Sequence, residues 1–249
     1  MDITSSDEEL AALRRGRRHP RRTQFDYLHV RRLVDDIAAA LAHVPGPVRD
    51  VLDIYCGTRP YDDLLPAGAL CTGLDVEGNP YGDLADVASN EFLPFEDDSF
   101  DLVTFYEAFQ YVEDPVHGLS EIQRVLRPGG TLLLTIPFAW EYDRTIVERR
   151  YTEPELVGLL EGWEDVQVVE NGGRLVVWST LTGTILERAR IRIPDAAGVG
   201  VAARVLFSLA FLGMNSLTPA LARIEERHAE GSVRFPMNLL LTARKPANG

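Results

Sequence analysis

The chain has 249 residues, of which 45% are hydrophobic, and its formal net charge at pH 7 is −13. This length and composition allow one domain with a substantial core and an appended subdomain. The acidic balance argues against general nucleic-acid binding, which depends on neutralising phosphates. Two cysteines, Cys56 and Cys71, are too few for a metal quartet or a disulfide framework, and we expect both to be small buried thiols.

The N-terminal region is rich in arginine and has no apolar leader, so we expect a soluble, cytoplasmic protein. Residues 1–23, which contain RRGRRHPRR, are expected to form a basic, partly disordered arm. A solvated arm is the simpler interpretation. The alternative is a patch that meets a phosphate-bearing substrate, a nucleic acid or an anionic membrane surface.

Residues 24–43 predict an amphipathic helix, because apolar side chains recur there at helical spacing and PGP at 45–47 ends the pattern. Apolar runs typical of parallel strands covered on both faces follow. A second helix is predicted over 114–126. Strands that alternate with helices in this way indicate a mostly parallel, doubly wound α/β sheet. The four predicted strands cover residues 48–55, 69–76, roughly 100–105, and 131–138.

Ligands of doubly wound sheets lie outside the carboxyl ends of the strands. We therefore expect four segments of this chain to converge on one crevice. They are residues 53–59, 75–77, 106–107 and 137–140.

The C-terminal half is predicted to complete the sheet around an insertion. YTEPELVGLLEGW (151–163) reads as a helix with Thr152 as N-cap, and strands are expected at 165–171 and 235–245. Residues 172–234 are too long for a simple connection and contain the apolar run 201–214. We expect them to form an apolar helical insertion or lid on a core of residues 24–171, with residues 235–249 as the final strand and tail.

Asp53 and Asp75 each end a predicted strand. A carboxylate at the tip of the second strand can grip a nucleotide ribose through two hydroxyl hydrogen bonds. The turn at Gly57 would let a ligand approach the backbone closely. Acidic residues end many strands, so ordinary strand ends are the alternative interpretation.

The stretch LPFEDDSFDLVTFYEAFQYVEDPVHGLSEIQRVLRPGGTLLLTIPF (93–138) resembles the class I S-adenosylmethionine-dependent methyltransferases, in their small-molecule, methyltransferase type 11-like branch. VLDIYCGTRPY and GLDV resemble that family's first and second motifs. The match covers about residues 50–170 plus the terminal strand. It implies a seven-stranded Rossmann-like sheet with an antiparallel last strand, S-adenosylmethionine as cofactor, and methyl transfer to a small-molecule acceptor.

The resemblance also implies roles for individual residues. Asp53 would hold a water or backbone amide beside the methionine moiety, and Gly57 would let the chain pass against the ligand. Asp75 would bind both ribose hydroxyls, and Val76 would pack on the adenine.

Further along, Asp86 and Val87 would lie beside the adenine amino group, and Tyr106 would border the sulfonium. Tyr55 departs from the family, which normally has glycine at this position. Tyr55 either points away or caps the methionine end, or its bulk fills the cofactor space. The residue is tolerable if its φ is negative; otherwise strain costs about 1–3 kcal/mol.

A hydroxyl or amine acceptor can need a base to remove its proton. The candidates at the crevice mouth are Glu107, His117, Glu141 and Asp143. We prefer Glu141 and Asp143 as catalytic residues because they follow the fifth strand, where family members commonly place acceptor contacts. The alternative is an ordinary solvated loop. No metal is expected, and arginines that could neutralise an anionic acceptor lie nearby at positions 144, 149 and 150.

The apolar insertion leaves the acceptor and the partners open. A core or dimer face is the simpler interpretation, and a lid or membrane-resting surface that admits a greasy, lipid-linked acceptor is the alternative. A glycan or natural-product intermediate also fits. Nucleic acid is not expected, because FYEA stands where base-modifying relatives have an NPPY-like tetrapeptide. The competing function is a catalytically inactive, methyltransferase-like binding or scaffold protein.

Overall fold

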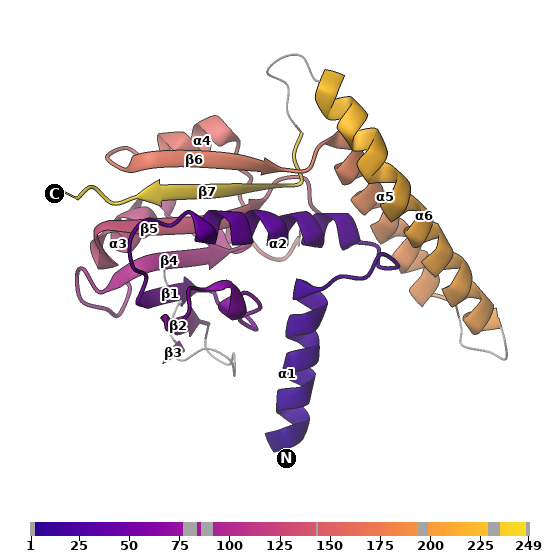
Figure 1. Cartoon of the computed structure of the whole chain (residues 1–249), viewed down its shortest axis with the longest axis horizontal. Helices are drawn as coiled ribbons and strands as arrows, with labels where there is room; N and C mark the ends of the chain where they lie inside the picture. Colours follow the sequence, from indigo (N-terminus) through magenta and orange to yellow (C-terminus); the bar gives the residue numbers. More distant parts are fainter. Residues whose placement is uncertain are drawn as a thin grey trace.

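The computed structural model describes residues 3–76, 84–85, 92–142, 144–193, 199–228 and 235–247. Within them the chain forms one sheet with the strand order β3-β2-β1-β4-β5-β7-β6 (Figure 1). The strands are β1 (Asp50–Ile54), β2 (Leu70–Asp75), β3 (Leu84–Ala85), β4 (Phe100–Tyr106), β5 (Leu126–Pro137), β6 (Glu164–Asn171) and β7 (Asn238–Arg244).

Strand direction follows the connections. β1, β2, β3, β4 and β5 run parallel, whereas β7 lies antiparallel between β5 and β6. Parallel neighbours need a long crossover, and the chain supplies helices for it. The predicted doubly wound α/β class with an antiparallel last strand is confirmed.

Alternation along the strands divides the core between the two faces of the sheet. Leu52 and Ile54 of β1 join the cluster that includes helix α3 (Pro115–Val125), whereas Val51 joins the cluster under helix α2 (Tyr27–Ala42). Each helix turns an apolar stripe toward its face, as the sequence predicts. Figure 1 shows α2 lying along one face and α3 behind the sheet.

Two predicted elements differ from the structure by five residues at one end, and the other boundaries differ by three or fewer. β5 begins at Leu126, five residues before the predicted start, because the RPGG segment continues the strand with Gly129 at φ +79°. Helix α4 (Glu153–Gly158) is shorter than the predicted 151–163, and the chain leaves it through turns that include Gly162 at φ +83°. Glycine tolerates this left-handed conformation, which ends helices.

Residues 172–234 contain two helices, α5 (Arg174–Ile191) and α6 (Val199–His228), which pack side by side at one end of the sheet (Figure 1). The N-terminal segment, expected to be a partly disordered arm, contains helix α1 (Ile3–Arg18). The division of the chain into an arm, a core and an insertion stays a prediction.

The α5–α6 pair holds the chain between α1 and α2. The side-chain amide of Asn215 in α6 donates to the carbonyls of Arg22 (2.8 Å) and Gln24 (2.7 Å). Gly183 of α5 lies so close to Phe25 that an added Cβ would meet its carbonyl oxygen at 2.8 Å. These contacts fix where α2 starts on the sheet.

Helix α6 is apolar and poorly covered. Its segment Gly200–Arg223 has a mean hydropathy of 1.6 and is long enough to cross a membrane, with 22% of the most apolar window buried. Length and composition are the sole basis for this observation, and buried helices of soluble proteins have the same properties.

Candidate functional site

The carboxyl ends of β1, β2 and β4 lie side by side, as the crevice prediction requires. Asp53 of β1 pairs in register with Gly73 of β2 and Thr104 of β4. Asp75 and Tyr106 end their strands at the same edge. This edge of the sheet is the place where doubly wound folds bind ligands.

Asp75 holds the turn that follows β1. The backbone N–H of Gly57 donates to Oδ2 of Asp75 (2.7 Å), and the N–H of Val76 donates to Oδ1 (2.7 Å). Gly57 has φ +55°, a conformation that glycine adopts without strain. A carboxylate at this strand tip is the group that accepts the ribose hydroxyls of a nucleotide in doubly wound folds. Asp75 and the Gly57 turn therefore fit a nucleoside ligand.

Asp53 is a buried carboxyl on the α2 side of the sheet. Its side chain is 3% exposed and accepts a hydrogen bond from Oγ1 of Thr104 (2.8 Å). Burial raises the pKa of Asp53 to about 7, against the lowering effect of the Thr104 hydrogen bond. Its role beside the methionine moiety stays a prediction.

Tyr55 adopts the conformation that the sequence analysis treated as strained. Its φ is +52°, so the condition of a negative φ is not met, and a cost of about 1–3 kcal/mol applies. The ring stacks on Phe105 with centroids 5.5 Å apart and packs against the core cluster on the α3 side. This packing supports the interpretation in which Tyr55 points away from the cofactor space.

Tyr106 is paired with the segment after β1. Its ring lies edge-on to Tyr61 with centroids 4.7 Å apart, and its hydroxyl is buried. Burial and the nearby Asp53 raise its pKa well above the usual value. Tyr106 therefore lies on the α2 side of the sheet, beside Tyr61.

Glu107 is held in an unusual position directly after β4. Its φ is +55°, and its backbone N–H donates to the carbonyl oxygen and to Oγ1 of Thr135 (both 3.0 Å). The side-chain amide of Asn238 donates to Oε2 of its carboxylate. Burial raises the pKa of Glu107, against the lowering effect of the neighbouring Thr135 and Asn238. A strained residue with a perturbed carboxyl is typical of a functional position.

Of the preferred catalytic pair, Glu141 alone is among the described residues, and the catalytic role of the pair stays a prediction. Glu141 is exposed and forms an ion pair with Arg188 of α5. Asp143, Asp86 and Val87 lie outside the described residues. Val76 is 45% exposed beside Asp75, as an adenine-packing residue can be.

Two of the three arginines considered for an anionic acceptor, Arg149 and Arg150, have other partners. Arg149 donates to the carbonyls of Val112 (3.3 Å) and Glu113 (2.7 Å), and Arg150 pairs with Glu148 at 2.8 Å. Both therefore have bonds that fix the loop before α4.

Sequence reasoning missed three residues close to Glu107. His29 of α2, Gln110 of the 3-10 turn Phe109–Tyr111, and Asn238 of β7 line one cavity with it. His29 falls on the buried face of an amphipathic helix, and Asn238 begins a strand 131 residues later than Glu107. Neither position carries a local motif, so only the folded chain reveals them.

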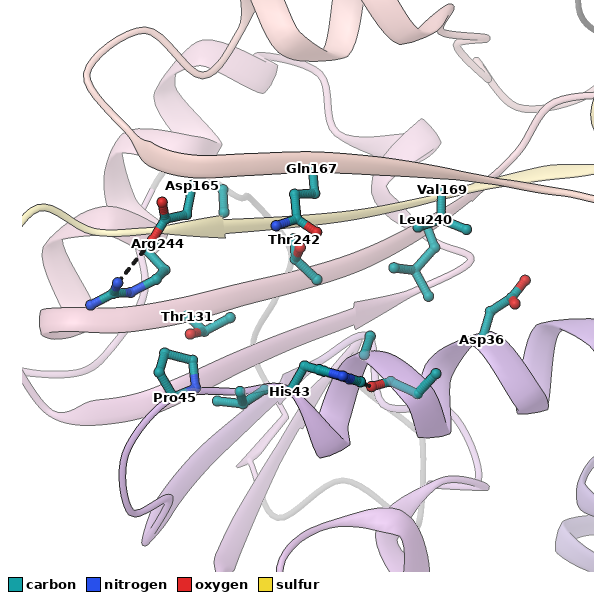
Figure 2. A pocket seen from close by; sticks show the side chains of 14 residues that line it. Asp36, His43, Pro45, Thr131, Asp165, Gln167, Val169, Leu240, Thr242 and Arg244 are labelled. Carbon is teal, nitrogen blue, oxygen red and sulfur yellow. Dashed lines mark hydrogen bonds and ion pairs between the residues drawn. The ribbon is translucent and has the colours of Figure 1, made fainter.

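A larger cavity of about 600 Å³ lies under the C-terminal half of α2, against β5, β6 and β7 (Figure 2). One end of this cavity lies at the amino ends of the parallel strands. It is lined there by Thr131 of β5, which pairs with Arg244 at the end of β7. That end is opposite to Asp53, Asp75 and Glu107, so we do not assign the cofactor to this cavity.

Comparison with known proteins agrees with this geometry. Residues 52–134 match a family model described as a methyltransferase domain. A demethylmenaquinone methyltransferase from Beutenbergia cavernae is 34% identical over 185 residues, which cover 61% of this chain and 76% of the relative. The chain belongs to the class I S-adenosylmethionine-dependent methyltransferases.

Other comparisons are narrower. A demethylmenaquinone methyltransferase from Mycobacterium sp. (strain JLS) is 38% identical over 96 residues, so the match covers 36% of our methyltransferase and 42% of the relative. The chain thus spans less than half the length of this relative. The crystal structure of the [4+2]-cyclase SpnF aligns with a TM-score of 0.53 at 21% identity, over 88% of this chain and 82% of that chain. At this identity the likeness shows the shared fold alone.

Proposed function

We propose that this protein transfers a methyl group from S-adenosylmethionine to a small-molecule acceptor. The observation that carries the proposal is the position of Asp75 at the carboxyl end of β2, where its carboxylate accepts hydrogen bonds from the N–H groups of Gly57 and Val76 beside the turn after β1. Family membership supplies the identity of the nucleoside ligand.

Bound S-adenosylmethionine would supply a methyl group on a leaving group that is already activated. The protein's own contribution is then to position the acceptor, to exclude water and to accept a proton where the acceptor carries one. The Tyr61–Tyr106 pair borders the reacting region on the α2 side, and Glu107 follows Tyr106 directly. Tyr106 and Glu107 both lie at the carboxyl end of β4.

The test is calorimetric titration of S-adenosylmethionine into the full chain. We expect binding by the wild type and a loss of at least about ten-fold in affinity for Asp75→Ala, because two ribose hydrogen bonds and the Gly57 anchor disappear together. Asp35→Ala, which removes an exposed ion pair with Arg31 on α2, is the matched control and should bind like the wild type. Absence of binding by the wild type would contradict the proposal and favour the scaffold alternative.

We also infer that the exposed face of α6 makes peripheral contact with a membrane surface. The support is the combination of a mean hydropathy of 1.6 with 22% burial in Gly200–Arg223. Self-association through the same face is the competing outcome, and a cytoplasmic location stays a prediction. The exposed apolar side chains of this face are those of Val201, Val205, Leu206, Leu209, Leu212, Leu217 and Leu221.

A further inference from the structure

A cavity of about 290 Å³ lies between α2 and the carboxyl ends of β4 and β5. Its size is at the lower end of the range for small-molecule pockets. The lining comes from six parts of the fold: α1, α2, the segments that follow β1, β4 and β5, and the start of β7. It consists of Arg17, Asp26, His29, Val30, Leu33, Tyr61, Glu107, Gln110, Tyr111, Pro137, Trp140 and Asn238.

Four of these lining residues carry a buried polar atom with no hydrogen-bond partner among the described residues. The atoms are Nδ1 of His29, Oε1 of Glu107, Oε1 of Gln110 and Oδ1 of Asn238. Gln110 and Asn238 are 3% and 1% exposed. Leaving one buried polar atom unpaired costs about 1–3 kcal/mol, so a cluster of four around one cavity indicates that molecules inside the cavity, either a ligand or the water it displaces, supply the partners.

The orientation of the two amides is fixed by chemistry. Asn238 must present its nitrogen to the Glu107 carboxylate, because an ionised carboxylate only accepts hydrogen bonds. Gln110 must present its nitrogen to the carbonyl oxygen of Glu107 (2.7 Å) for the same reason. The unpaired atoms of both amides are therefore oxygens, and together with Oε1 of Glu107 they form a set of three acceptors.

The other residues that line the cavity indicate the shape and the charge of the molecule that fits it. Trp140 and His29 lie with ring centroids 5.5 Å apart, and Tyr61 and Tyr111 add two more rings. Burial, with Arg17 nearby, lowers the pKa of His29 to about 4, so the imidazole is neutral at pH 7. Two carboxyl groups, Glu107 and Asp26, line the cavity against the single guanidinium of Arg17. These features favour a flat molecule with hydrogen-bond donors over an anion.

We propose that this cavity binds the methyl acceptor. The acceptor is a ring-bearing small molecule with at least two O–H or N–H groups and no net negative charge. Glu107 accepts the proton of the acceptor's reacting group. This inference rests on the proposed function and names its substrate class and its base.

The proposed step balances with the cofactor that the family uses. The acceptor's oxygen or nitrogen forms a bond to the methyl carbon while the carbon–sulfur bond breaks and leaves its electron pair on sulfur. The acceptor's proton moves to Oε1 of Glu107, and later leaves to solvent. Neither an oxidant nor a metal is required.

The test uses 4-nitrocatechol, whose absorption spectrum changes when it ionises, and 1,2-dimethoxy-4-nitrobenzene, which has nearly the same shape and no donor. Each is titrated into the full chain in the presence of S-adenosylhomocysteine, at a pH below the ionisation midpoint of free 4-nitrocatechol. We expect 4-nitrocatechol to bind at least about ten-fold more tightly than the dimethoxy compound. We also expect its bound spectrum to shift toward the ionised form, since Glu107 takes the proton.

Variants separate Glu107 from general packing. Glu107→Gln should abolish the spectral shift and weaken 4-nitrocatechol by at least about ten-fold, while S-adenosylmethionine affinity stays within about two-fold, which also shows that the variant is folded. His29→Leu should weaken 4-nitrocatechol and keep the shift. Gln167→Leu, a polar-to-apolar change in the other cavity, is the matched control and should leave both readouts unchanged (Figure 2).

Three results would overturn the inference: equal affinity for the two compounds, no binding of either, or an undiminished spectral shift in Glu107→Gln. Any of these, obtained with intact S-adenosylmethionine binding, removes the acceptor assignment and leaves the proposed function standing. Loss of S-adenosylmethionine binding by the wild type removes the proposed function instead.

Discussion

The side-chain amide of Asn238 donates a hydrogen bond to the carboxylate of Glu107 and so joins the first residue of β7 to the residue after β4. The antiparallel placement of β7 beside β5 brings these residues together, because Asn238 pairs with Pro137 at the carboxyl end of β5. The last strand thus supplies a donor to the acid at the mouth of the crevice.

Replacing Asn238 tests how the pKa of Glu107 is set. Asn238→Leu removes a hydrogen bond to the charged form, so the pKa of Glu107, already raised by burial, should rise further. Because Glu107 accepts a proton only when ionised, the ascending acidic limb of the methyl-transfer rate should move to higher pH.

The charged groups around Glu107 stay in place in this experiment. They are Arg17 of α1, Asp26 at the N-cap of α2, and Arg150, and the neutral His29 of α2 also stays. The measurement is kcat/KM against pH, with Gln167→Leu on β6 as the control. An unmoved limb would show that another group titrates.

Tyr55 allows strain and packing to be separated. Tyr55→Ala loses the stacking on Phe105 and keeps a Cβ at φ +52°, whereas Tyr55→Gly loses the ring and the strain. We therefore expect Gly to be more stable than Ala by about 1 kcal/mol, the reverse of their usual order. Urea unfolding measures the difference in stability between the two variants. A more stable Ala variant would contradict the left-handed backbone.

We expect His29 to lower the free energy of unfolding, and to lower it more as the pH falls. Its folded pKa of about 4 lies below the usual 6.5, so between these values the unfolded chain binds a proton that the folded chain does not. The wild type should lose stability as pH falls from 7 to 5, with a slope of at most about 1.4 kcal/mol per unit. His29→Leu removes this loss and also the unpaired Nδ1, so it should be more stable than the wild type, most clearly at pH 5.

Denaturant unfolding at both pH values measures this effect. If His29→Leu is destabilised at both pH values, His29 has a structural role instead of a binding one.

Two glycines in the helical pair should respond in opposite ways to alanine. An added Cβ at Gly183 would meet the carbonyl oxygen of Phe25 at 2.8 Å, so Gly183→Ala should destabilise the protein by about 1–3 kcal/mol. Gly213 of α6 has nothing within 4 Å, so Gly213→Ala should stabilise it by about 0.5–1 kcal/mol through helix propensity. Thermal unfolding compares the two, and equal effects would argue against close packing of the chain before α2 on α5.

Membrane contact through α6 is measured by co-sedimentation with lipid vesicles. The double variant Leu206→Ser and Leu217→Ser removes apolar area from two side chains that are each 66% exposed, so binding should fall several-fold. Folding should be unaffected because both side chains already face outward. If the wild type sediments as a dimer without lipid, and the variant as a monomer, the face is a contact between copies instead.

The sequence alone determined the sheet class and most of its elements. Continuous apolar runs and the intervening amphipathic helix fixed the positions of β1, β2, β4 and α3 to within a few residues. Period and length are local properties, so they survive without tertiary information. β5 began earlier than predicted because its RPGG segment, a typical turn, is accommodated within a strand by Gly129.

The part of the crevice that we propose for the cofactor could also be predicted from the sequence. Asp53 and Asp75 lie near the ends of strands that a parallel sheet must bring together, and Gly57 lies in the turn that follows the first of them. The cavity that we propose for the acceptor could not be predicted from the sequence. His29, Gln110 and Asn238 carry no motif, and the preferred Glu141 turned toward Arg188 of α5. Which of several carboxylates becomes buried, strained and hydrogen-bonded depends on the packing of α2 and β7 against β4. Such contacts between distant segments are decided only when the chain folds.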